Sequence, residues 1–147
     1  MNRLIWAAPL LATALAGCAT VEEGVAEQVG DTYNATLAGS NEVGPGDPDG
    51  YARAEITVTD EIDQICYDIN DIRGLDTITA MHIHRGRAGT NGPVVFPITK
   101  ANEGGWKGCK SRAEWTEDAI ERDWSNYYVN IHTAAYPDGA IRGQLRK

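Results

Sequence analysis

Three histidines lie in two short segments, and the chain of 147 residues contains no others. One residue separates His82 from His84, and His132 lies in a second apolar segment. Side chains two apart on a β-strand point to the same side, so a strand would place the first two imidazoles on one face. Neutral imidazole nitrogens are ligands for copper and zinc. A neighbouring strand that carried the third histidine would complete a metal site with one coordination position open.

The same histidines have an alternative role. The glycine-rich loop 86–93 directly follows the first pair and is flexible enough to fold over such a site, bringing backbone oxygens near it. The imidazoles would then brace this loop by donating hydrogen bonds to its carbonyls. Spacing alone does not separate a metal site from a braced loop, because the position of His132 depends on how the strands pair.

The two histidine segments alternate between apolar and polar residues, as half-buried strands do. The apolar residues on the side expected to face the core are Met81, Ile83, Val129 and Ile131. If these four residues form the core, all three imidazoles lie on the outside of the sheet.

Similar short runs, separated by Gly, Pro, Asn and Asp, occupy the chain from residue 32 onward. They predict strands at 33–38, 51–59, 64–70, 79–84, 94–98, 127–133 and 140–146, and one short helix at 113–122. This pattern predicts an all-β fold, an antiparallel Greek-key or immunoglobulin-like sandwich of about seven or eight strands with the helix in a loop. Both an open sandwich and a closed barrel fit it.

The start of the chain has the layout of a signal peptide. Arg3 precedes an uninterrupted apolar stretch that ends in Leu-Ala-Gly just before Cys18. The stretch is shorter than the roughly 18 residues of a transmembrane helix. The residues around the cysteine resemble the bacterial lipobox, which implies that residues 1–17 are removed and that Cys18 is lipidated. An ordinary cleaved signal, leaving a free thiol, is the alternative.

Lipidation implies a location in the cell envelope. Ala19 stands where an Asp would favour the inner membrane, so by similarity to known lipoprotein sorting we expect the outer membrane, with the domain facing the periplasm or the cell surface. Residues 18–30 are small and acidic, as a tether would be, and a single domain is expected at 31–147.

The mature chain would be acidic. The formal net charge is −8, and it becomes −9 when Arg3 is removed with the signal peptide. No cluster of Lys and Arg with interleaved aromatic residues offsets this charge, so nucleic acid is excluded as a partner class. Cations remain as candidate partners.

Two cysteines remain after Cys18 is assigned to the lipid. In an exported protein, Cys66 and Cys109 are expected to form a disulfide, which would close a loop of about forty residues and stabilise the fold by ~4 kcal/mol. A metal-binding thiolate pair is the alternative, although neither cysteine lies in a CxxC-type spacing.

Other motifs indicate structure more than chemistry. The acidic segment 47–50 resembles the opening of a calcium loop but lacks the later ligands, so it is interpreted as a turn. The aromatic residues in the second half of the chain are expected to pack in the core or at its rim, and a ligand-binding surface is the alternative. They are Trp106, Trp115, Trp124, Tyr127 and Tyr128. No nucleophile motif or phosphate-binding loop is present, so an enzyme is the less favoured class.

Several motifs together resemble the CHRD (chordin) domain family. They are Tyr33-Asn34-Ala35-Thr36-Leu37, His82-Ile83-His84-Arg85-Gly86, Gly92-Pro93-Val94-Val95, Tyr128-Val129-Asn130-Ile131-His132-Thr133 and Ile141-Arg142-Gly143-Gln144-Leu145. The resemblance covers residues 32–146 and implies a β-sandwich without an assigned activity. The His-x-His strand with its glycine-rich loop is distantly similar to copper-zinc superoxide dismutase, but three histidines are too few for that enzyme's full metal set.

Three hypotheses follow. The first is a lipid-anchored envelope binding module with a copper or zinc site at His82, His84 and His132. The second is a structural or adhesion module that binds an envelope protein or a glycan, with the histidines only bracing a loop. The third is a metalloenzyme, which needs an acid or base beside the histidines. Glu55 and Asp68 lie on outward strand faces, but their distance from the histidines does not follow from the sequence.

Overall fold

The computed structural model describes residues 30–102, 104–111 and 115–147. The expected signal peptide, Cys18 and all but the last residue of the expected tether lie outside the described residues. Within the part that is described, no helix is long and apolar enough to cross a membrane.

Eight strands form one antiparallel sheet in the order β5-β4-β7-β8-β1-β2-β3-β6. Their bounds are β1 (Asp31–Ala38), β2 (Tyr51–Thr59), β3 (Gln64–Arg73), β4 (Ile78–Arg85), β5 (Val94–Ile98), β6 (Trp106–Ser111), β7 (Tyr127–Thr133) and β8 (Ile141–Gln144). The helix α2 (Thr116–Asp123) lies between β6 and β7, and the short 3₁₀ helices are η1 (Gly39–Asn41), η2 (Asp60–Ile62) and η3 (Trp124–Asn126). The prediction of an antiparallel all-β fold with a short helix in a loop is confirmed.

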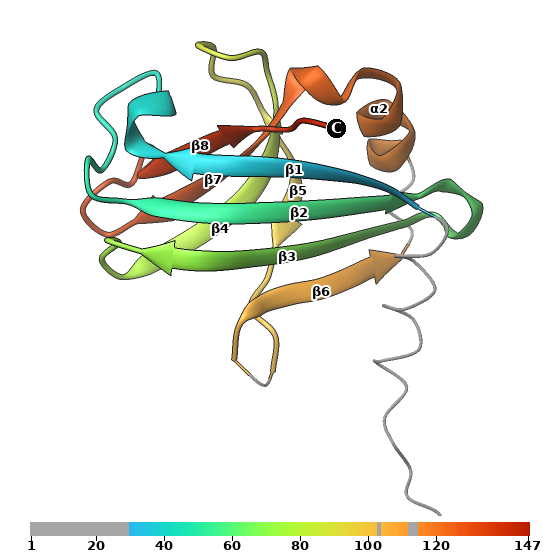
Figure 1. Ribbon diagram of the computed structural model, residues 1–147, viewed down its shortest axis with the longest axis horizontal. Helices are drawn as coiled ribbons and strands as arrows, with labels where there is room; N and C mark the ends of the chain where they lie inside the picture. Colours follow the sequence, from blue (N-terminus) through green and yellow to red (C-terminus); the bar gives the residue numbers. More distant parts are fainter. Residues whose placement is uncertain (1–29, 103, 112–114) are drawn as a thin grey trace, which may run out of the picture.

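The sheet bends over on itself, so that β4 and β5 pass behind β2 and β3 (Figure 1). Its two edge strands approach each other: the Lys110 ammonium on β6 donates to the Pro97 carbonyl oxygen on β5, at 2.9 Å. The Tyr67 hydroxyl on β3 donates to the carbonyl oxygen of Thr99, just after β5, at 3.0 Å. The architecture is therefore a flattened, nearly closed barrel, intermediate between the two forms that the sequence allowed.

Apolar side chains from both layers fill the interior. The residues predicted for the core face of the histidine strands, Met81, Ile83, Val129 and Ile131, are all at most 1% exposed. Ile120 of α2 is fully buried and covers part of the same core. This packing fixes the orientation of β4 and β7, because turning either strand over would move its apolar residues out of the core.

Strand β6 was not predicted from the sequence. Its six residues are Trp-Lys-Gly-Cys-Lys-Ser, and Trp106 is the one that packs against the core cluster, so the hydrophobic alternation of a strand is almost absent. Pairing with β3 holds β6 in the sheet. Cys66 on β3 lies directly opposite Cys109 on β6, and the two form a disulfide. The predicted disulfide is thereby confirmed.

The segment 47–50 forms a turn, as interpreted. The Asp49 backbone N–H donates to the Asp47 carboxylate at 3.1 Å, and the Gly50 N–H donates to the Asp47 carbonyl at 3.2 Å. Packing also accounts for four of the five aromatic residues, whereas Trp115 is 79% exposed, so the packing prediction is wrong for that residue.

Candidate metal centre

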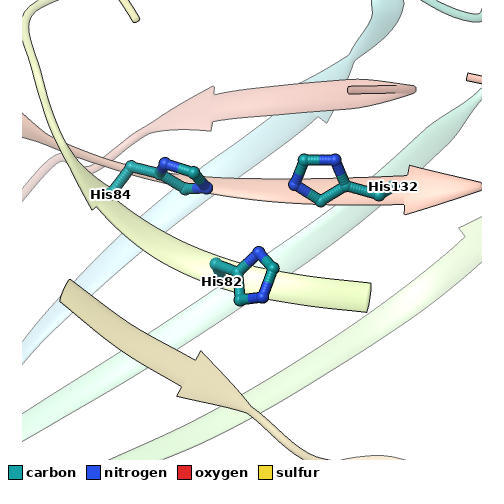
Figure 2. Close-up of side chains that lie close together, drawn as sticks. All are labelled: His82, His84 and His132. Atoms are coloured by element: carbon teal, nitrogen blue, oxygen red, sulfur yellow. The ribbon is translucent and has the colours of Figure 1, made fainter. Parts of the chain in front are cut away.

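The three histidines meet on the outer face of two neighbouring strands. His82 and His84 lie on β4 and His132 lies on β7, and their rings face one another (Figure 2). The antiparallel register places Ala80 opposite His132 and Asn130 opposite His82, so the third imidazole lies diagonally across from the first pair. The ring centroids are 5.6 Å apart for His82 and His84, 5.2 Å for His82 and His132, and 6.1 Å for His84 and His132.

This outer face is covered rather than open to solvent. Tyr128 and Asn130 on β7 and Arg142 on β8 point away from the barrel interior, yet each is at most 3% exposed. His84 is 8% exposed, and the other two histidines are half-buried. Loops cover the face, so the site lies in a small polar layer between the sheet and its loops.

Two backbone carbonyls hold two of the imidazoles. His84 Nδ1 lies 2.9 Å from the Gly92 carbonyl oxygen, and His132 Nδ1 lies 2.9 Å from the Pro137 carbonyl oxygen. A carbonyl oxygen only accepts hydrogen bonds, so each Nδ1 carries the hydrogen and donates it. In the neutral ring, Nε2 then has a free lone pair.

Three ring nitrogens in the cluster are buried and have no hydrogen-bond partner: His82 Nδ1, His84 Nε2 and His132 Nε2. One ligand nitrogen from each of the three residues lies within 4.8 Å of the others. Nitrogens bound to one zinc ion at about 2.0–2.1 Å would lie roughly 3.4 Å apart, so small ring rotations would bring them into range. The three histidines could therefore hold a metal ion.

Burial favours the neutral form of His82 and His84. Desolvation lowers the pKa of His82, and the nearby His132 and His84 lower it further. Desolvation also lowers the pKa of His84 more than the hydrogen bond to Gly92 raises it, and the charge of Arg142 lowers it as well. The deprotonated imidazole is the form that binds metal.

The acids considered from the sequence are not part of this cluster. Glu55 on β2 pairs with Asp68 on β3, whose carboxylate lies 3.6 Å from the Lys107 ammonium. Strand β3 is separated from β7 by three intervening strands in the sheet. Among the described residues, the group that could bind a metal contains the three histidines and no carboxylate.

Sequence reasoning missed the residues around the imidazoles. The Tyr128 ring stacks on the His84 ring with a centroid distance of 4.9 Å, and the Arg142 guanidinium carbon lies 3.4 Å from the Tyr128 centroid. Glu42, on the loop after β1, accepts a hydrogen bond from Asn130, and burial raises its pKa. The signal in the sequence was strand alternation, which places Tyr128, Asn130 and Arg142 on the same outward face as the histidines.

Comparison with known proteins identifies one family. The family model described as the CHRD domain matches residues 33–145, which include all three histidines and every strand in whole or in part. Neither the curated proteins nor the solved structures gave a significant match.

Proposed function

This chain belongs to the CHRD domain family, and on that premise we propose that it is a lipid-anchored binding module of the bacterial cell envelope. Its ligand is a copper or zinc ion held by His82, His84 and His132. The family names a fold more than an activity, so the proposal rests on the chemistry of this chain's own site.

The observation that supports it is the set of three buried, unpartnered nitrogens. An unsatisfied buried polar atom costs about 1–3 kcal/mol, and three such atoms in one cluster are unusual unless an ion, another ligand or ordered water satisfies them. Loop bracing alone uses Nδ1 of His84 and Nδ1 of His132. It leaves the opposite nitrogen of each ring, and Nδ1 of His82, without a role.

The donor set favours borderline transition metals. Three neutral nitrogens without a carboxylate or thiolate suit Cu and Zn, whereas calcium and magnesium require oxygen ligands. The hydrogen bonds from Nδ1 to the carbonyls of Gly92 and Pro137 are of the outer-shell kind that orients a metal-bound histidine. Three protein ligands leave one position for water or an exogenous donor.

Lipid anchoring is supported by the sequence around Cys18. The apolar stretch and the residues before the cysteine resemble those of exported lipoproteins, and by the same resemblance Ala19 favours the outer membrane. The protein would then present its histidine site to the periplasm or to the cell surface.

A structural or adhesion role is the second candidate, in which the domain binds an envelope protein or a glycan. The two histidine-to-carbonyl hydrogen bonds would then serve only to hold loops. The large exposed ring of Trp115 provides a contact surface of the kind such a partner would use. This role predicts partner capture that does not depend on metal.

Metal analysis separates the two roles. The full chain is expressed in a bacterial envelope, extracted in mild detergent without a histidine tag or chelator, and analysed for metal by mass spectrometry. Copper and zinc affinities are then measured in competition with chromophoric chelators. We expect one ion per chain, and an affinity reduced by about 100-fold or more in His82→Ala, His84→Ala and His132→Ala, because loss of an outer-shell partner alone costs 10–100-fold.

Thr79→Ala is the matched control, because Thr79 lies on β4 with its side chain exposed and outside the cluster. It should bind metal like the wild type. If all three histidine variants bind copper and zinc with the affinity of the wild type, the metal site is rejected and the search turns to an envelope partner.

A further inference from the structure

Arg142 is a fully buried charged residue beside the histidine cluster, and it offers no metal ligand. It lies on β8, next to β7, and is 1% exposed. A buried guanidinium is costly unless its donors are satisfied. Its partners therefore indicate what the residue does in this fold.

The guanidinium holds the middle of the loop 86–93. Arg142 Nη1 donates to the Thr90 carbonyl oxygen at 2.8 Å, and Nη2 donates to the Arg87 carbonyl oxygen at 2.8 Å. Two nitrogens of one rigid, planar group thus hold two carbonyls of a single loop. Lysine, a point charge on a flexible stem, does not reproduce this fork.

Both ends of the same loop are also held. The Arg85 N–H donates to the Pro93 carbonyl at 3.0 Å, and Gln144 donates to the Gly86 carbonyl at 2.9 Å. Gly92 passes so close to the chain that a Cβ there would lie 1.6 Å from the Arg85 carbonyl oxygen. The loop therefore has little freedom in its path once Arg142 is in place.

The loop and the ring stack connect Arg142 to His84 in two ways. The Gly92 carbonyl accepts the His84 Nδ1 hydrogen, while the Gly92 N–H donates to the Tyr128 hydroxyl at 3.2 Å. The Tyr128 ring in turn stacks on His84, with an interplanar angle of 10°, and contacts the Arg142 guanidinium. Through these contacts Arg142 can affect both the tautomer and the orientation of the His84 imidazole.

We propose that Arg142 is a positioning residue of the metal site, which acts through the loop 86–93 and Tyr128 to hold His84 as the Nδ1–H tautomer with Nε2 free for the ion. The effect that we expect on metal affinity rests on the proposed function. Its structural part, the tautomer of His84, can be measured without any metal.

The first experiment is imidazole ¹⁵N NMR on the metal-free protein. In the wild type we expect a single Nδ1–H tautomer for His84, and in Arg142→Met a mixture of tautomers. His132 is an internal control, because its Nδ1 is held by Pro137 on a different loop. A change confined to His84 supports positioning, whereas an unchanged His84, or an equal change at His132, overturns it.

The second experiment measures copper and zinc affinity in the full chain. Arg142→Met and Arg142→Lys should lower the affinity by about 10–100-fold, as loss of an outer-shell partner does. Arg146→Met, which removes an exposed arginine near the same end of the chain, should leave it unchanged. Tyr128→Phe removes the hydrogen bond from the Gly92 N–H with little change in packing, and it should also lower the affinity for copper and zinc. This variant keeps the test decisive if the Arg142 variants do not fold.

The outcomes separate the two proposals. Wild-type affinity in folded Arg142→Met and Tyr128→Phe overturns the positioning role while leaving the metal site intact. A wild-type chain that binds neither metal overturns the proposed function, and the NMR experiment still decides whether Arg142 positions His84.

Discussion

In two of the three histidines of the cluster, a backbone carbonyl holds one ring nitrogen and so decides which nitrogen stays free. His84 and His132 donate from Nδ1 to carbonyls and keep Nε2 free, whereas His82 has its own Nδ1 unpartnered. The same residue type therefore offers different donor atoms on one sheet face. The spacing of residues does not reveal this, because both carbonyl partners come from loops.

Acidic pH should destabilise the metal-free protein through His82 and His84. The pKa values of His82 and His84 are lowered, mainly by desolvation, so below pH 6.5 the unfolded chain takes up protons that the folded chain does not. Their contribution to the free energy of unfolding is complete above pH 6.5 and is lost as the pH falls through the folded pKa values. Urea unfolding at pH 7.5, 6.5 and 5.5, with chelator present, should show this loss in the wild type.

The double variant His82→Gln and His84→Gln is the comparison, because it removes both titrating groups. Between pH 7.5 and 5.5, its free energy of unfolding should fall by less than that of the wild type. If wild type and variant lose stability equally over this range, the two imidazoles are not responsible.

At the scale of elements, the strands that pack apolar side chains into the core can be predicted from the sequence, whereas a strand that depends on pairing alone cannot. Strands β4 and β7 alternate clearly and pack Met81 and Val129 into the core, so their pattern is visible in the sequence. Strand β6 is an edge strand with almost no apolar alternation, and its place depends on pairing with β3. The disulfide between Cys66 and Cys109 makes that pairing covalent.

Removing this disulfide should destabilise the fold, with the effect centred on β6. The bond joins residues 43 apart, so the loop-entropy model gives a loss of about 4 kcal/mol in the free energy of unfolding. Cys66→Ala combined with Cys109→Ala should lower the urea midpoint accordingly. Hydrogen exchange should accelerate first at 106–111, and equal acceleration across β4 and β7 would contradict a local role for the bond.

For the whole molecule, the sheet has two buried faces of different character. The barrel interior is apolar, whereas the outer face of β4, β7 and β8 is polar and covered by loops. The histidine cluster belongs to this second layer, so the proposed metal site depends on the loops as much as on the strands. The apolar interior stabilises the fold, while the outer layer contains the histidine cluster.

The location of the molecule should depend on one residue outside the described part. Cys18→Ser removes the thiol that would carry the lipid, so labelled fatty acid should not be incorporated and the protein should leave the membrane fraction. Labelling and fractionation of the wild type, with and without an inhibitor of lipoprotein signal peptidase, are the controls. Membrane retention of unlabelled Cys18→Ser would count against lipid anchoring through this cysteine.

The amino-acid sequence by itself determined the fold class, the family, most strands, the disulfide and the three histidines. Strand alternation is local, so it placed Met81 and Ile83 on the core face and His82 and His84 on the outer one. The cysteine count in a chain expected to be exported led to the bond between Cys66 and Cys109.

Only the tertiary structure decided that the imidazoles converge, because this depends on the register that pairs β4 with β7. It also decided that loops bury the outer face, and that Arg142 and Tyr128 surround His84. His84 and Tyr128 are 44 positions apart in the chain, and His82 and His132 are 50 apart, so these contacts form only when β4 and β7 pair. No local pattern encodes them.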